Sequence, residues 1–475
     1  MSQTGMVPSV EPGSKNSKEG FLARVGASLA DWSEKWFPDA YVFALVALVV
    51  VVVFALFMGQ TPYKIAVNFG AHYWDLTAFT MQASFVIISG YIVASSRPVY
   101  RLIGKLSAVP KTPRGAIAMV AFFATATSVL SWGFSLIFSG LMIREVSKKM
   151  PGVDYRAMGA AGYLGLGSIW ALGLSSAPAL LMTTKTSIPP ALYKISGLIS
   201  LNETLFTWQN LAMIVVLLTV SVLVAYWSAP SADKAKTAES AGVNYEALTV
   251  EIEPKQKPGE WLEYSPILTI VVVLLGLFYL VDTFATKGGF AALDYATYDF
   301  MFLMLGMILH WTPKSFLKAA AKSIPATGGV LIQFPIYAAI FGIMVSSGIT
   351  DVLAKFFVEI STQNTYPLLV GVYSAILGVF LPSGGGKWIV EAPYVLEAAK
   401  SLHVSLGWTV QIYNAAEALP NFINPFWMLP MLGLLNVKAR DLAGYSILQL
   451  MIHTPVVLIL VWLLAKTMPY IPPQF

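Results

Sequence analysis

The chain contains no cysteine, and only 12% of its 475 residues are charged. The absence of cysteine excludes disulfides, thiolate metal sites and cysteine nucleophiles. The sequence also lacks a P-loop, a His-Glu-x-x-His zinc helix and a Gly-x-Ser-x-Gly elbow, which argues against an ATP-driven pump and against an enzyme. A net charge of +5 does not indicate nucleic-acid binding. We therefore expect no cofactor, no bound metal and no nucleic-acid partner.

Hydrophobic residues make up 56% of the chain, and its mean hydropathy is +0.68. This composition predicts an all-α polytopic membrane protein embedded in the lipid bilayer. A helix needs about 20 apolar residues to cross the hydrocarbon core. Stretches of this kind predict spans at 39–59, 75–96, 157–182, 208–229, 264–284, 296–311, 325–348, 408–435 and 442–466.

Two further apolar stretches, 115–143 and 365–399, are interrupted near their middles by glycine and serine. Each could form two spans or one re-entrant hairpin. If both are hairpins and the N-terminus is cytoplasmic, most of the 30 lysine and arginine residues lie inside, as the positive-inside rule requires. The first stretch has basic clusters on both flanks, so both of its ends are expected in the cytoplasm. Backbone at such tips is tolerated where it lines a cavity.

The spans and hairpins occur in the same order in two halves of the chain. We predict inverted-topology repeats with two re-entrant hairpins and two discontinuous helices, in a multi-pass protein with a cytoplasmic N-terminus and a periplasmic C-terminus. The predicted regions are a cytoplasmic segment with an amphipathic surface helix (1–38), the first repeat (39–229), a cytoplasmic linker (230–263), a connecting transmembrane helix (264–284) and the second repeat (285–475).

Corresponding helix breaks in two halves of a membrane protein indicate a transporter's substrate site. Half-helix N-termini carry unpaired N–H groups that favour anions, including carboxylates. For each single residue, a role in satisfying the kinked backbone is an equal alternative. The candidate substrate-binding residues at the tips and breaks are Ser131, Gly133, Ser135, Ser175, Ser176, Ser383, Gly384, Gly385, Gly386, Lys387, Asn421 and Asn424.

Charged side chains at membrane depth are costly, which makes them functional candidates. We identify three: Lys387, Glu391 and Glu417. Lys387 and Glu391 have an i,i+4 spacing and could pair with each other. Alternatively, Lys387 contacts a substrate carboxylate or stands in for a cation. Glu391 and Glu417 are the candidates for binding a coupling ion, either H⁺ or Na⁺.

Aromatic residues surround the polar tips and breaks. An aromatic-lined pocket with few polar anchors suits a carboxylate with a short alkyl tail. For any single ring, ordinary helix or lipid packing is the stronger interpretation. These residues are Trp132, Phe134, Trp388, Phe422, Phe426 and Trp427.

Three motifs, 128–134, 381–388 and 421–425, resemble those of the bacterial short-chain fatty acid transporter family, the AtoE-like proteins of the ion transporter superfamily. The resemblance implies uptake of small monocarboxylates such as butyrate or acetoacetate across the bacterial inner membrane, coupled to H⁺ or Na⁺. It also implies an elevator mechanism and a possible homodimer. Dicarboxylate carriers of this superfamily have Ser-Asn-Thr at their hairpin tips, and this chain lacks that motif. A wider-specificity carboxylate carrier, an ion antiporter and a channel remain alternatives.

Overall fold

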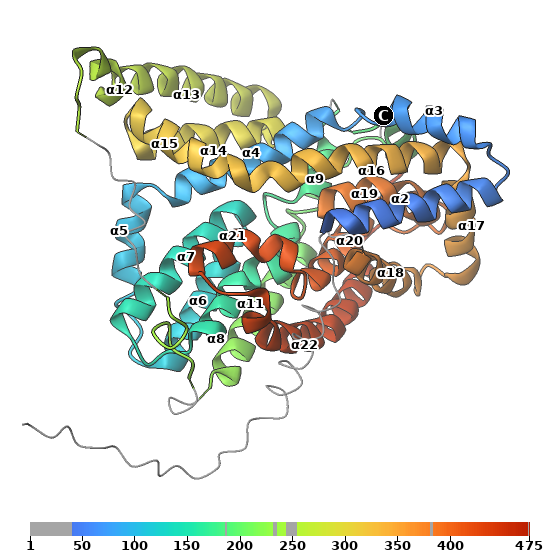
Figure 1. Ribbon diagram of the computed structural model, residues 1–475. Coiled ribbons are helices and arrows are strands. Elements are labelled where there is room, and N and C mark those ends of the chain that lie inside the picture. Colours follow the sequence, from blue (N-terminus) through green and yellow to red (C-terminus); the bar gives the residue numbers. More distant parts are fainter. Residues whose placement is uncertain (1–39, 186–187, 231–234, 244–253, 381–382, 474) are drawn as a thin grey trace, which may run out of the picture.

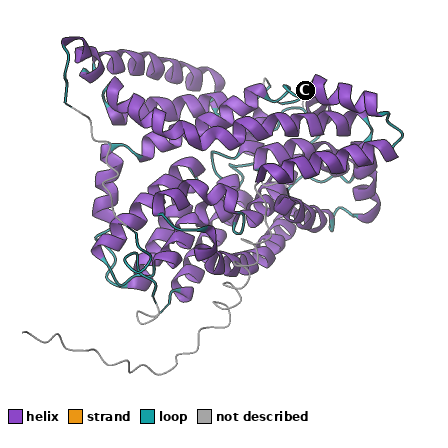
Figure 2. Cartoon of the chain, in the orientation of Figure 1, coloured by secondary structure: helices purple, strands orange, loops and turns teal. Residues whose placement is uncertain are grey.

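The computed structural model describes residues 40–185, 188–230, 235–243, 254–380, 383–473 and 475, and over these residues the chain is helical with no strand (Figure 2). The amphipathic helix predicted within 1–38 lies outside the described residues. Six helical segments are long and apolar enough to cross a membrane: Thr77–Ala94, Tyr155–Thr183, Trp208–Ser228, Pro258–Lys287, Pro313–Ser346 and Asp441–Ala465. The protein is therefore a multi-pass membrane protein, as its composition predicts.

Several short helices connect the apolar ones, and the spans predicted from the sequence include none of them. Some begin with a Thr-Pro pair, as α15 (Pro313–Ser323) does. Thr312 caps α15 by accepting a hydrogen bond from the Ser315 N–H at 3.4 Å, and Pro313 supplies the preset φ of the first turn. The predicted span 325–348 thus continues from an earlier helix. The other short helices are α3 (Pro62–His72), α5 (Arg97–Leu106), α10 (Pro190–Ser196), α12 (Trp261–Tyr264) and α17 (Ile349–Ile360).

Each interrupted apolar stretch forms two helices joined by a short connection. The first pair is α6 (Pro113–Ser128) and α7 (Trp132–Lys149), which pack against each other. The second pair is α18 (Tyr366–Phe380) and α19 (Gly384–Ser401). The second pair is less closely joined, because α18 packs mainly on α20 (Leu406–Asn421).

Both helices that follow these pairs are broken. In the first half, α8 (Tyr155–Leu164) continues through a π-helical segment, η1 (Gly165–Ile169), and a 3₁₀ turn, η2 (Trp170–Leu172). After four non-helical residues the chain resumes as α9 (Ala177–Thr183). In the second half, α20 ends at Asn421 and α21 (Pro425–Leu435) begins after three more residues. Proline lies in the first turn of both resumed helices, where its missing N–H costs no hydrogen bond.

The remaining long helices flank this broken core (Figure 1). On one side, α4 (Thr77–Ala94) packs on α14 (Tyr295–His310) and α16 (Gly328–Ser346), and α16 packs on α2 (Ala40–Phe57). Next to α14 lies α13 (Ile267–Lys287). On the other side, α11 (Trp208–Ser228) contacts α6 and α22 (Ala439–Ala465).

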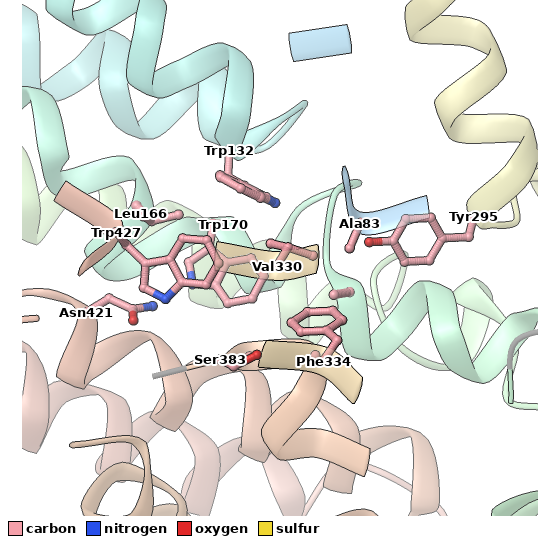
Figure 3. Close-up of a pocket in the computed structure, with 13 residues that line it drawn as sticks. Ala83, Trp132, Leu166, Trp170, Tyr295, Val330, Phe334, Ser383, Asn421 and Trp427 are labelled. Carbon is pink, nitrogen blue, oxygen red and sulfur yellow. The ribbon is translucent and has the colours of Figure 1, made fainter. Parts of the chain in front are cut away.

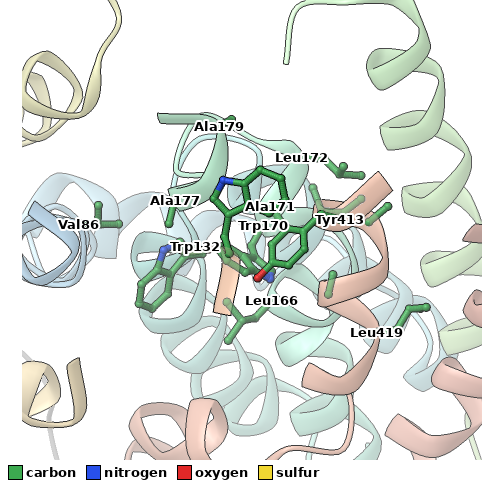
Figure 4. Close-up of a cluster of buried hydrophobic side chains, with 14 of the residues drawn as sticks. Val86, Trp132, Leu166, Trp170, Ala171, Leu172, Ala177, Ala179, Tyr413 and Leu419 are labelled. Carbon is green, nitrogen blue, oxygen red and sulfur yellow. The ribbon is translucent and has the colours of Figure 1, made fainter. Parts of the chain in front are cut away.

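The two halves of the chain interlock at the helix breaks. α20 from the second half packs on η1 and η2 from the first, and α21 packs on α7. Their buried side chains belong to one cluster, which includes Tyr413 from the second half and Trp170 and Leu166 from the first (Figure 4). Residues far apart in sequence therefore share one core at the centre of the protein.

Candidate functional site

An inner cavity lies where the connections within the two helix pairs, at the tips of the two predicted hairpins, meet the helix breaks (Figure 3). Its polar lining comes from Ser383 and the glycines that follow it, from Asn421 and from the hydroxyl of Tyr295. The remaining lining is aromatic or aliphatic. These lining residues are Ala83, Trp132, Leu166, Trp170, Ala177, Tyr295, Val330, Phe334 and Trp427.

A second cavity adjoins this inner cavity and shares Trp132, Val330 and Trp427 with it. The rings of Trp132 and Trp427 meet edge to face with their centres 5.5 Å apart, so this aromatic pair stands between the two cavities. Gly133 lines the second cavity, and the exposed Lys322 lies at its margin. An anion could therefore approach the inner cavity past a cationic side chain.

The serine at each hairpin tip caps the helix that follows it. Ser131 Oγ accepts a hydrogen bond from the Phe134 N–H at 3.3 Å. Ser383 Oγ accepts one from the Gly386 N–H at 3.2 Å. Each cap satisfies one N–H at a helix end, while others at the same end keep their positive partial charge. Ser383 also lines the inner cavity, so the N-terminus of α19 faces it.

The glycines at the second tip allow large side chains to approach the backbone closely. A Cβ atom on Gly384 would overlap the Trp170 ring, and one on Gly385 would overlap the Phe79 ring. Gly386 is similarly close to Tyr337. A hydrogen bond from the Tyr413 hydroxyl to the Gly384 carbonyl, at 2.5 Å, fixes the start of α19. A side chain at any of these glycines would displace the aromatic ring that packs against it.

Of the five predicted serines, Ser383 alone lines the inner cavity, and three others besides Ser131 bond to backbone groups instead. Ser175 Oγ accepts a hydrogen bond from the Trp132 N–H at 2.9 Å, which ties the first tip to the break before α9. Ser176 Oγ accepts one from the Ala179 N–H at 3.4 Å and caps α9. Ser135 donates to the Ala124 carbonyl at 2.7 Å within the first hairpin. Ser175 therefore holds the first hairpin and the broken helix together, while Ser135 acts within the hairpin and Ser176 within the broken helix.

Replacing Ser175 with alanine is expected to lower stability by about 1–3 kcal/mol, because the buried Trp132 N–H would lose its acceptor. Thermal unfolding in detergent measures the loss. Thr219→Ala is the matched control, since its hydroxyl bonds to a helix carbonyl on an exposed face of α11. Equal melting temperatures for the Ser175 variant and wild type would contradict this role.

The two predicted asparagines lie at the break between α20 and α21. Asn421 is the last residue of α20 and lines the inner cavity beside Trp427 (Figure 3). Asn424 is buried, and its backbone N–H donates to the Pro420 carbonyl at 3.1 Å. The break thus brings one amide side chain, that of Asn421, to the cavity.

Lys387 is fully buried at the centre of a charged cluster one turn into α19. Its Nζ lies 2.7 Å from Glu417 Oε2 and 3.5 Å from Glu391 Oε2. The same ammonium donates to the Ser374 carbonyl at 2.7 Å and lies 4.5 Å from the centre of the Tyr413 ring. The Ser374 hydroxyl donates to Glu391 Oε1.

The i,i+4 pair suggested by the sequence is therefore part of a larger cluster, and its nearer carboxylate comes from α20. The cluster lies behind the cavity, because neither Lys387 nor the two glutamates line it. Among the described residues, no three His, Asp or Glu side chains gather as a metal site would require.

Some lining residues are missing from the candidates that the sequence suggested. Tyr295 and Phe334 face the cavity from α14 and α16, which carry no helix break to draw attention to them (Figure 3). Asp299 is a further omission, a buried carboxylate inside the predicted span 296–311. The sequence alone could have identified it, because an acidic residue inside a membrane span is costly and is therefore a functional candidate.

Comparisons with solved structures reveal the same fold in two membrane transporters. The YdaH transporter of Alcanivorax borkumensis aligns with a TM-score of 0.57 and 14% identity, over 92% of this chain and all of that one. Neisseria gonorrhoeae MtrF, described among antimetabolite efflux pumps, aligns with a TM-score of 0.51 and 13% identity over 94% and 98% of the two chains. At these identities the likeness establishes the fold alone.

Sequence relatives are closer. An Escherichia coli K12 protein is 32% identical over 90% of this chain and 97% of its own length. A Haemophilus influenzae protein is 27% identical over 92% and 99% of the two chains. Both carry the name "Putative short-chain fatty acid transporter". The family described as short chain fatty acid transporter matches residues 21–464. With nearly its whole length matched, the chain belongs to the short-chain fatty acid transporter family.

Proposed function

We propose that the protein is a secondary active transporter that carries short-chain monocarboxylates, such as butyrate or acetoacetate, across the bacterial inner membrane. The observation that carries this proposal is the inner cavity, in which the α19 N-terminus and Asn421 place polar groups at one end of a mostly aromatic and aliphatic lining. A single carboxylate would bind there, since N–H groups at a helix N-terminus favour an anion. The short alkyl tail would lie against Trp132, Trp170 and Phe334.

The same lining disfavours a dicarboxylate. A second carboxylate would lie against aromatic and aliphatic walls, and burying an uncompensated charge costs several kcal/mol. None of the described residues that line the inner cavity is a lysine or arginine that could neutralise it. The cavity should therefore select substrates with a single carboxylate, because it has one polar end and is otherwise apolar.

We infer that the coupling cation is H⁺. Lys387 already occupies the position between Glu417 and Glu391 where a metal cation would bind. One ammonium neutralises one carboxylate, so the second requires a proton for the buried cluster to be neutral. Glu417 Oε1 has no hydrogen-bond donor among the described residues, which leaves room for that proton.

We also propose an elevator-type cycle in which residues 115–182 and 365–435 move as one body. The contacts of α20 with η1, and of α21 with α7, support this grouping because they join the two halves directly. The other helices, including α4 and α14, would form the scaffold, and two copies would associate through it.

Purified protein in liposomes is expected to accumulate labelled butyrate when the pH outside is lower than inside, with no Na⁺ present. Protein-free liposomes correct for passive entry of the free acid. Unlabelled butyrate should compete, whereas succinate should compete at least about 100-fold more weakly because its second charge costs several kcal/mol. Accumulation driven by Na⁺ alone would overturn H⁺ coupling. Succinate that competes equally would overturn the pocket assignment, and passage without accumulation would indicate a channel.

A further inference from the structure

Asp299 lies in the first half of α14, one turn after Tyr295 and next to Tyr298. Its side chain is only 6% exposed, and the one other residue of α14 that can carry charge near neutral pH, His310, lies at the far end of the helix. Neither carboxylate oxygen has a hydrogen-bond donor among the described residues. A buried carboxylate without a donor or a cation is strongly disfavoured in its charged form and takes up a proton instead.

Among the described helices that pack on α14, none brings a cation to this carboxylate. α9 has no titratable residue, and α4 has only Tyr91. On α13, Asp282 is exposed and Lys287 lies 3.6 Å from Asp294. The helices α5 and α15, which carry basic residues, contact α14 near its other end, since α15 follows α14 directly and α5 follows the part of α4 that meets Gly306. Their basic residues are Arg97, Arg101, Lys105, Lys314, Lys318 and Lys322.

Two tyrosines connect Asp299 to the transport machinery. Tyr295 lines the inner cavity, and its hydroxyl points toward Ala83 on α4 (Figure 3). Tyr298 donates a hydrogen bond to the Leu130 carbonyl at 3.0 Å, in the connection between α6 and α7. Asp299 therefore lies one turn from Tyr295, which lines the cavity, and next to Tyr298, which contacts the first hairpin tip.

We propose that Asp299 is a second proton-binding site, separate from the Lys387 cluster, and that its occupancy is linked to the position of the first hairpin. This inference rests on the proposed H⁺-coupled transport. With Tyr298 bonded to Leu130, Asp299 is dehydrated and one carboxylate oxygen carries a proton. When the hairpin moves and that hydrogen bond breaks, water reaches Asp299 and the proton leaves to solvent. The cycle then transfers one proton at Asp299 for each substrate.

Asp299→Asn tests this directly, because the amide imitates the protonated acid in size and neutrality but cannot release a proton. The variant should fold and should retain counterflow of labelled butyrate at equal pH on both sides. Accumulation under a pH difference of one unit should fall about tenfold, since each coupled proton supports about a tenfold gradient per pH unit. Asp299→Glu, which restores a titratable group, should recover part of the accumulation.

An infrared difference spectrum gives a readout that does not depend on transport. Wild type at neutral pH should show the carbonyl stretch of protonated Asp299 in addition to that of the protonated glutamate in the Lys387 cluster, and only the Asp299 contribution should be missing from Asp299→Asn. Undiminished accumulation by the Asn variant, or a carboxylic acid band identical in both proteins, would overturn the role of Asp299. The proposed function fails separately, if wild type shows no butyrate counterflow at all.

Discussion

Lys387→Met is expected to destabilise the protein by about 3–5 kcal/mol, since it leaves Glu391 and Glu417 buried without a cation. Both glutamates are essentially unexposed, so water cannot replace the ammonium without opening the packing of α18, α19 and α20. The expected result is a much lower yield of folded protein and a clear drop in melting temperature, measured by thermal unfolding in detergent.

A triple variant separates the loss of the charge from the loss of the side chain. Lys387→Met combined with Glu391→Gln and Glu417→Gln removes every charge of the cluster and should recover most of the stability. Under the proposed mechanism it should lose the proton carried there. Lys400→Met is the control, because Lys400 belongs to an exposed pair with Glu397. If Lys387→Met alone melts like wild type, the cluster is not the buried ion group described above.

Gly90→Ala is the second substitution with a large expected effect. Gly90 on α4 meets the backbone of the first hairpin tip, and an added Cβ would lie 2.5 Å from Phe134 N and 2.8 Å from the Gly133 carbonyl carbon. Backbone atoms cannot rotate away as a side chain does, so α4 and α7 must separate. Overpacking of this kind costs about 1–3 kcal/mol, enough to change the population of this arrangement by about 5- to 150-fold.

The effect of Gly90→Ala is measured by butyrate uptake together with thermal unfolding. Uptake should fall strongly, because the contact between α4 and the first tip lies at the boundary between the proposed scaffold and the proposed moving body. Forcing the two apart would disturb the movement of one body against the other. Gly104→Ala on α5 is the matched control, since a Cβ atom added to Gly104 would have no atom within 4 Å. Wild-type uptake and stability in the Gly90 variant would show that this contact does not constrain transport.

Features that depend on composition and on neighbouring residues could be predicted from the sequence. An apolar composition with few charges requires a membrane, so a multi-pass helical protein followed from it. Serine before a glycine-containing turn is a local signal, and Ser131 and Ser383 both cap the helices that begin after the interruptions. The breaks before α9 and α21 have a local signal of the same kind in Pro178 and Pro425, because proline acts within one turn.

Contacts between distant residues became evident only in the folded chain. Glu417 lies 30 positions after Lys387, and nothing in their spacing identified it as a nearer partner than Glu391. The cavity wall at Tyr295 and the contact of Tyr298 with Leu130 depend on how α14 packs beside α4 and the first hairpin. Helical periodicity fixes which side chains share a face, but the partner of that face is chosen by packing between segments far apart in the chain.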